Sequence, residues 1–483
     1  MVNNYYKTYQ NNWSNNLNFI ILSILLSVPA ILLDKWTIYS LPLIFLITLC
    51  FIFGERLIIA LILISLFTLV GELNESLRKV VQLVDFALLG FLFLKRFGLN
   101  FKDYPRVPKS IGYLLLFYFA TMIISAMMSS YPFAGIGMIG RQAAFFIIVY
   151  IFYSLIRNVA VIKNYIYALL AVAVIFVIIS LIAFFFEGYS LVDIVAKNRT
   201  RISAVITNSE ALTNFYIIAF PIAMAVLLVN KQRFYKVISI LFLLFICLGL
   251  ILSMSRSAIL AILLSSSIIL FFLRRKLFYR FLLVVLGLVL LFLLYPPLNE
   301  TLTLFFRIEE GLSARDYLWS MSLNIIKDHP IFGLGPGAYK YEAFNYFPYM
   351  LDNWWGKLFI YFYNVSGGVN LSHNYFLVFF TEFGLFGFIT AVTLPFIFFK
   401  IGIKTIKKYS FKTETKEIYY LIICLFAIGV SIILRNFFNS IGILYLGGIT
   451  TDLPFWLVFS SIVFFYLNPI NSMINQYQKV LKP

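Results

Sequence analysis

The sequence predicts an all-α polytopic membrane protein with about fourteen transmembrane helices and one long extracytoplasmic loop that contains amphipathic helices. The first observation behind this prediction is composition: hydrophobic residues make up 62% of the chain and charged residues only 12%. A soluble domain has about half apolar and about a quarter charged residues. The second observation is that apolar runs long enough to cross a hydrocarbon core of about 30 Å recur along the chain.

The apolar runs place the expected helices. We expect crossings near residues 19–33, 36–53, 57–70, 80–94, 111–129, 138–156, 164–186, 211–229, 237–252, 257–273, 281–296, 373–399, 418–434 and 453–467. The number of crossings between residues 36 and 94 is left open, because the runs there are short. No signal-peptide pattern precedes the first run, so we expect the first helix to direct insertion.

The loops between these runs carry basic residues on alternate sides of the membrane. Lys and Arg cluster near residues 95–109, 157–163, 231–236, 274–280 and 400–416, and the positive-inside rule places these loops in the cytoplasm. This topology accounts for much of the formal charge of +18, so the charge does not indicate nucleic-acid binding. The other loops, near residues 187–210, 253–257, 297–372 and 435–452, then face the outside.

We expect the chain to have three parts. An N-terminal transmembrane bundle covers residues 1–200, a catalytic transmembrane core covers residues 201–400 and includes the extracytoplasmic loop 297–372, and C-terminal transmembrane helices cover residues 401–483. The cytoplasmic loops are too short to hold a domain that hydrolyses ATP. The three cysteines lie inside apolar runs and predict no disulfide framework.

Three of the outer loops carry arginine, against the positive-inside rule. Arg256 lies between two expected helices and is framed by serines, where a guanidinium can bind an anion through two hydrogen bonds. Arg315 lies at the start of an expected amphipathic helix, and Arg201 precedes Asn208 in the loop before residue 211. Ordinary explanations remain: Arg256 as an interfacial arginine, and Asn208 as a helix cap beside a surface charge, Arg201.

The long outer loop combines an amphipathic helix with an aromatic segment. Residues 313–330 have apolar side chains at helical spacing and end at a proline, which predicts a helix lying on the membrane. Trp319 lies within this helix, and Trp354 and Trp355 lie in the aromatic segment that follows it. Such rings can stack on the faces of sugars, and an interfacial aromatic belt explains them equally well.

The outer loop ends at the second of the two histidines in the chain. His373 and Asn374 lie where the chain re-enters the membrane, and Glu382 lies about two turns further into the expected helix. A neutral imidazole can accept a proton from a hydroxyl near neutral pH, and a carboxylate inside an apolar helix indicates a functional or tightly paired site. A hydrogen bond at the helix start is the alternative role for His373. His329 lies at a helix end, where capping explains it.

The sequence predicts no metal site and no cofactor. The chain has only two histidines, its cysteines lie in apolar runs, and its outer loops contain no paired carboxylates at ligand spacing.

The motifs between residues 201 and 387 form a set. Its members are Arg201, Asn208, Leu212, Ser253, Arg256, Ala258, Arg315, Trp319, His329, Pro330, Gly333, Gly335, His373, Asn374, Leu377, Glu382, Gly384 and Gly387. In order and spacing this set resembles the O-antigen ligase and polymerase superfamily (WaaL and Wzy). Ala204 and Glu210 stand where that family has Gly and Asn. The first part of the chain resembles the family only in its hydrophobic profile.

The resemblance implies a metal-independent, inverting glycosyltransferase in the bacterial cytoplasmic (inner) membrane, with its active site facing the periplasm or the outside. The implied donor is an oligosaccharide on undecaprenyl pyrophosphate. Arg256 and Arg315 would hold the pyrophosphate, His373 would activate the acceptor hydroxyl, and Arg201 would be an auxiliary anion contact. The further expected substrate contacts are Asn208, Asn374, Glu382, Trp319, Trp354 and Trp355.

The resemblance also implies partners and leaves alternatives. The expected partners are the lipid-linked oligosaccharide and the bilayer, with a chain-length regulator and a flippase as candidate proteins, and no nucleic acid. A polymerase would extend a chain of repeat units, whereas a ligase would transfer the glycan to lipid A core or another acceptor. The helix count and the large aromatic loop favour a polymerase. A small-solute transporter would instead bind near the bilayer midplane with broken helices.

Overall fold

The structure is a computed structural model that describes residues 59–60, 62–67, 75–98, 102, 104–186, 209–253, 255–296, 303, 315–347, 372–410, 416–440, 442–444 and 449–469. Of the described residues 86% are helical, and they contain no strand. The predicted all-α class is therefore confirmed.

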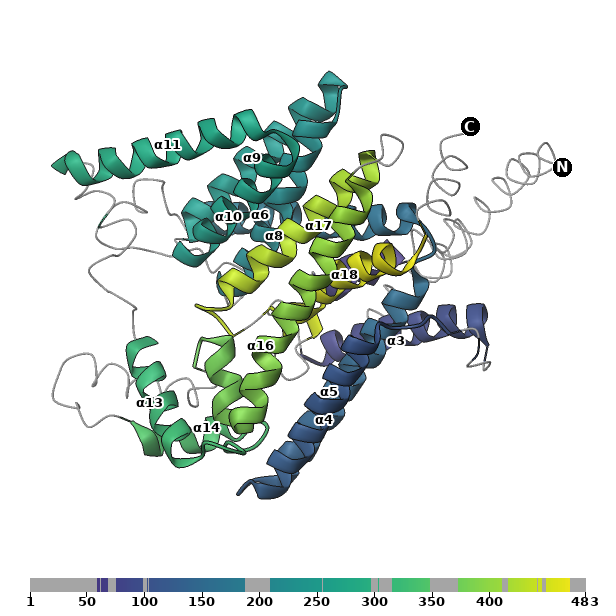
Figure 1. The fold of residues 1–483 in the computed structure, drawn as a ribbon, viewed down its shortest axis with the longest axis vertical. Coiled ribbons are helices and arrows are strands. Elements are labelled where there is room, and N and C mark those ends of the chain that lie inside the picture. Colours follow the sequence, from purple (N-terminus) through teal and green to yellow (C-terminus); the bar gives the residue numbers. More distant parts are fainter. Residues whose placement is uncertain are drawn as a thin grey trace. The chain divides into compact units, whose positions relative to one another are not determined.

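Most of the described helices match expected crossings (Figure 1). They are α3 (Glu75–Phe97), α4 (Lys109–Met128), α5 (Pro132–Leu155), α6 (Val159–Phe186), α8 (Ser209–Val229), α9 (Arg233–Ser253), α10 (Arg256–Leu273), α11 (Arg275–Leu294), α13 (Arg315–Asp328), α14 (Tyr339–Glu342), the 3-10 helix η3 (Ala343–Tyr346), α16 (Tyr375–Tyr409), α17 (Lys416–Arg435) and α18 (Ile449–Leu467). Every expected crossing from 80–94 to 453–467 coincides with one of them.

Eight of the described helices are long and apolar enough to cross a membrane. The apolar parts of α8 and α18 are shorter, Thr213–Val229 and Thr451–Leu467. The expected crossings 19–33 and 36–53 lie outside the described residues, and 57–70 is described only in part. The total of about fourteen crossings therefore stays a prediction.

Backbone packing divides the chain into two units. One lies within residues 1–104 and 160–172, and the other lies within residues 105–159 and 173–483. The expected boundaries at residues 200 and 400 stay a prediction. The second unit contains all the motifs of residues 201–387 that the structure describes, so the site belongs to this unit.

Within the second unit, α8 packs on α9, α10 and α17, and α10 packs on α17. The Ser431 hydroxyl on α17 donates to the carbonyl oxygen of Ala261 on α10 at 3.0 Å. A Cβ at Gly249 on α9 would lie 2.9 Å from the ring of Tyr216 on α8, so these two helices touch through a glycine. Small residues at such contacts let helices approach closely inside a bilayer, where hydrophobic burial does not drive association.

The lysine-rich end of α16 is tied to the end of α18. The ammonium of Lys408 donates to the carbonyl oxygens of Phe465 and Tyr466 at 3.0 Å each, and to that of Asn468 at 2.6 Å. Two of these carbonyls belong to the last turn of α18 and the third to the residue that follows it, where a helix leaves its acceptors without partners of its own. One lysine therefore caps α18 and fixes it against α16.

Helix α16 is not the single straight helix that the sequence predicts. Gly384 has φ 64° and ψ −154°, which interrupts the helix, and the ring centroids of Phe380 and Phe388 lie 5.1 Å apart. Eight residues of a continuous helix rise about 12 Å, so the chain reverses direction at Gly384. A short helix of residues 375–383 therefore lies beside the start of the longer helix of residues 385–409 (Figure 1).

The reversal corrects the expected position of Glu382. A Cβ at Gly387 would lie 2.4 Å from the carbonyl oxygen of Phe379, so the two helices are in backbone contact. The longer helix runs toward Lys408, at the end predicted to be cytoplasmic. With that orientation the short helix runs outward from His373 to Glu382, and Glu382 does not lie deeper in the membrane than His373. Hydropathy is continuous across the break and gives no sign of it.

Candidate functional site

The glycine-rich segment of residues 330–338 crosses α16 at the point of reversal. The amide of Leu385 donates to the Pro330 carbonyl at 2.9 Å, and the amide of Leu334 donates to the Thr381 carbonyl at 2.8 Å. Gly335 adds a third hydrogen bond, to the Glu382 carbonyl, at 2.9 Å. The carbonyl and amide groups that the broken helix leaves without intrahelical partners are thereby satisfied.

Glu382 is an interior residue of this crossing. Its side chain is only 1% exposed, and its Oε2 accepts a hydrogen bond of 3.0 Å from the backbone amide of Gly337. The Ser125 hydroxyl of α4 lies 2.7 Å from the Glu382 carbonyl and 2.6 Å from the Phe332 carbonyl. The carboxylate thus holds the glycine-rich segment against α16, and its expected role as a substrate contact stays a prediction.

The predicted amphipathic helix is present as α13. Its apolar face, Leu318, Met321 and Ile325, forms a buried cluster with Leu334, Ala338, Tyr339 and Ala343, and Trp319 packs against this cluster. The hydroxyls of Ser322 and Tyr339 lie 3.2 Å apart within it, and burial raises the pKa of the Tyr339 phenol to about 12. Arg315 is the first residue of α13, so the crossing at α16 fixes the helix that carries this arginine.

The aromatic rings of the described outer segment pack on one another. Tyr131, in the turn between α4 and α5, stacks on Tyr341 of α14 at 4.8 Å between centroids. Tyr317 stacks on Phe347 at 5.8 Å with an interplanar angle of 8°. Trp354 and Trp355 lie outside the described residues, as do Arg201 and Asn208. The expected contacts of these four residues with a substrate stay predictions.

His373 lies in a tight turn before α16. It has φ 51°, which is unusual for a residue with a side chain, and its imidazole is partly buried. The helix cap is Asn374, whose Oδ1 accepts from the amides of Phe376 and Leu377 at 2.9 and 3.1 Å. The structure therefore gives the capping role to Asn374, while His373 is held one residue outside the helix.

The end of α17 holds this turn in place. The amide of Tyr375 donates to the Asn436 carbonyl at 3.0 Å, and Nδ2 of Asn374 donates to the Phe437 carbonyl at 2.9 Å. Both acceptors directly follow Arg435, the last residue of α17. His373 therefore lies at the end of the bundle where α17 ends.

Arg256 lies at the same end of the bundle. It is the first residue of α10, with Ser255 at the N-cap position, and it is partly buried. The contact between Ser431 and Ala261 lies four residues below Arg435 and five residues below Arg256, a rise of about 6 to 8 Å on each helix. Since α10 and α17 run in opposite directions, Arg256 and Arg435 lie at about the same height along the bundle axis.

Arg435 is a residue of this region that sequence reasoning missed. It is only 1% exposed, and its guanidinium donates to the side-chain oxygens of Asn214 and Thr213 on α8. The available signal was an arginine in the last turn of an apolar helix, at the edge of an outer loop. Three cationic or proton-accepting side chains, Arg256, Arg435 and His373, thus come from distant parts of the chain to one end of the bundle.

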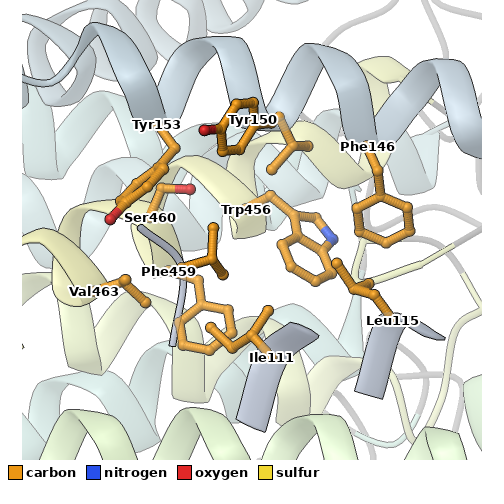
Figure 2. A pocket seen from close by; sticks show the side chains of 11 residues that line it. Ile111, Leu115, Phe146, Tyr150, Tyr153, Trp456, Phe459, Ser460 and Val463 are labelled. Carbon is orange, nitrogen blue, oxygen red and sulfur yellow. The ribbon is translucent and has the colours of Figure 1, made fainter. Parts of the chain in front are cut away.

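One pocket among the described residues lies elsewhere and is apolar. Its volume is about 70 Å³, and it lies between the first half of α4, the last half of α5 and α18 (Figure 2). Tyr150, Tyr153, Phe146, Trp456 and Phe459 are prominent in its lining. Because Ser125, at the other end of α4, contacts the α16 crossing, this pocket lies at the opposite end from the polar groups. Its lining suits hydrocarbon and offers little for glycosyl transfer.

The described residues contain no group of three or more His, Cys, Asp or Glu side chains that could hold a metal ion. That the reaction needs no metal stays a prediction, because parts of the outer loop fall outside those residues.

These features define a class: a multi-pass helical membrane protein with a re-entrant helix and polar groups gathered at one end of a helical bundle. Residues 240–392 match the family model described as O-Antigen ligase. The match supports the predicted resemblance to the O-antigen ligase and polymerase superfamily over this part of the chain, and it does not separate a polymerase from a ligase. A search of curated proteins found no match. The family indicates a membrane enzyme of O-antigen or polysaccharide assembly that acts on a lipid-linked glycan.

Proposed function

We propose that this protein polymerises oligosaccharide repeat units carried on undecaprenyl pyrophosphate into a cell-surface polysaccharide such as O-antigen. The proposed site faces the periplasm or the outside of the bacterial cytoplasmic membrane. The observation that supports this proposal most is the grouping of His373 and Arg256 at one end of the bundle, within the region that matches the O-antigen ligase family. Arg315 is supplied by α13, which packs on α16.

In the proposed reaction the imidazole of His373 accepts the proton of an acceptor hydroxyl. The freed oxygen attacks the anomeric carbon of the donor sugar, and the bond from that carbon to pyrophosphate breaks with inversion of configuration. The electron pair leaves with pyrophosphate, where Arg256 and Arg315 stabilise the negative charge without a metal ion. A positioned base of this kind contributes on the order of a hundred- to ten-thousand-fold in rate.

The test is to give the purified protein, in liposomes, a lipid-linked repeat unit and to follow the length of the glycan. We expect chain growth in the wild type, almost none in His373→Ala, and most of the wild-type rate in His329→Ala. The second variant is a matched control because His329 is exposed and contacts Tyr346. Normal chain growth in a folded His373→Ala protein would refute the role of His373 as base.

A ligase is the alternative within the same family. Its transfer step has the same chemistry, and it differs in the acceptor. Adding lipid A core to the same assay distinguishes the two: a ligase moves the glycan to the core without lengthening it, whereas a polymerase lengthens the glycan with or without the core.

The broken helix α16 is a feature that transporters also have, so this different class has one structural observation in its favour. The family match favours an enzyme. A small-solute transporter would form no new glycosidic bond in the same assay, with or without lipid A core, whereas a polymerase or a ligase would form one.

A further inference from the structure

We propose that Arg435 is a positioning residue for His373. In this proposal Arg435 anchors the end of α17 to α8, and the two residues after it hold the turn that carries the imidazole. The inference rests on the proposed function for the role of His373 as base. The position that Arg435 imposes on the turn can be tested without any catalytic assay.

Arg435 anchors the end of α17 to α8. The guanidinium of Arg435 donates two hydrogen bonds, from Nη1 to Oδ1 of Asn214 and from Nη2 to Oγ1 of Thr213. A guanidinium has a rigid planar fork of donors, so two acceptors on neighbouring residues of one helix fix its position and its orientation. Thr213 is 0% exposed and Asn214 is 5% exposed, so water does not compete for these contacts. The end of α17 is therefore held at a defined place on α8.

Hydrogen bonds and a ring contact connect the residues after Arg435 to the residues after His373. Asn436 and Phe437 follow Arg435 directly, and their carbonyls accept from the Tyr375 amide and from Asn374 Nδ2. The ring centroids of Phe376 and Phe437 lie 4.7 Å apart, which adds a packing contact between the same two segments. The residues on both sides of this junction lie within three positions of Arg435 or His373 in the sequence. A shift of the arginine thus displaces the turn through a short chain of contacts.

The region around Arg435 is closely packed. Gly442, in the loop after α17, has φ 130°. A Cβ there would lie 3.1 Å from Nδ2 of Asn436 and 3.6 Å from Oδ1 of Asn214. These two asparagines and the glycine therefore converge in one tightly packed interior region. When packing is this close, a side chain that no longer fits moves its neighbours.

The substitution Arg435→Lys separates charge from geometry. Lysine keeps the positive charge but offers a point charge on a flexible stem, so it cannot reproduce two fixed hydrogen bonds to α8. Thr213→Val is the milder second variant, because it keeps the shape of the side chain and removes one acceptor of the fork. A displacement of about 1 Å at a catalytic group can lower turnover by up to about 100-fold. We expect that loss in kcat, with KM nearly unchanged, for Arg435→Lys, and a smaller loss for Thr213→Val.

The structural readout uses the small number of histidines. The chain has two, so His329→Asn leaves His373 as the single imidazole and makes its NMR signals in ¹⁵N-histidine-labelled protein unambiguous. In this background Arg435→Lys and Thr213→Val should each shift the His373 signals. Lys408→Met is the control: it removes a second cation, here partly buried, that ties two helices together at the end of α16 far from His373. It should leave the His373 signals and the chain-growth rate unchanged.

A double-mutant comparison completes the test. If Arg435 acts through His373, Arg435→Lys should cause no further loss of turnover in a His373→Ala background. Unshifted His373 signals in both Arg435→Lys and Thr213→Val would overturn the inference, as would a further loss of turnover in that background. If Arg435→Lys does not fold, Thr213→Val decides the outcome. Normal turnover in His373→Ala would overturn the proposed function, while the NMR shift would still decide whether Arg435 positions the turn.

Discussion

Replacing Gly384 by alanine tests whether the reversal of α16 holds the site together. At φ 64° and ψ −154° the backbone is in a region that is open essentially to glycine alone. A Cβ there would lie 2.1 Å from the Ile331 carbonyl oxygen and 2.2 Å from its carbon. Both atoms belong to backbone, so no side-chain rotation relieves the clash. The glycine-rich segment must therefore move away from α16.

The magnitude follows from the contacts that the movement breaks. Three backbone hydrogen bonds join the segment to α16, and each contributes about 1 kcal/mol net. We expect Gly384→Ala to lower the free energy of unfolding by about 3 kcal/mol. Turnover should fall as well, because the segment carries α13 and Arg315 with it. The measurements are equilibrium unfolding in sodium dodecyl sulfate and the chain-growth assay.

Gly287→Ala is the control for this prediction. Gly287 lies within α11, and no atom lies within 4 Å of a Cβ at that position. Alanine is the better helix former by about 0.5–1 kcal/mol, so this variant should be as stable as the wild type or slightly more so. If Gly384→Ala were equally stable and active, the reversal and its crossing would not be the element that holds the site.

Three further predictions concern Glu382, the topology and the metal. Glu382→Gln should keep most of the stability, because an amide oxygen can still accept from the Gly337 amide, whereas Glu382→Ala leaves that buried donor unsatisfied at a cost of about 1–3 kcal/mol; equal unfolding free energies for the two variants would contradict this. Cysteines introduced at Lys340 and Lys412 should differ in intact cells, with an impermeant thiol reagent labelling only the former, and equal labelling would contradict the orientation. Chain growth should persist in EDTA, and a loss that added magnesium restores would show that the arginines do not act alone.

The sequence by itself determined the fold class and most helix positions. Inside a bilayer every backbone amide must find a partner within the protein, so long apolar runs have only helices available to them, and the runs from 80–94 onward became helices. The amphipathic helix at Arg315 followed from the spacing of its apolar residues. The family motifs and His373 were also readable from sequence, because they are local patterns of residue types.

Only the tertiary structure decided how α16 is bent and what the buried polar groups contact. The run from Tyr375 to Tyr409 is continuously apolar, and its break at Gly384 is stabilised by hydrogen bonds from residues about 50 positions earlier in the chain. Arg435 is similar: in sequence it is an ordinary arginine at a helix end, and its burial against Asn214 depends on α8, more than 200 residues away. Hydropathy and periodicity indicate which segments, and which faces of them, are exposed to lipid or to water. Contacts between distant segments depend on packing, which only the folded chain defines.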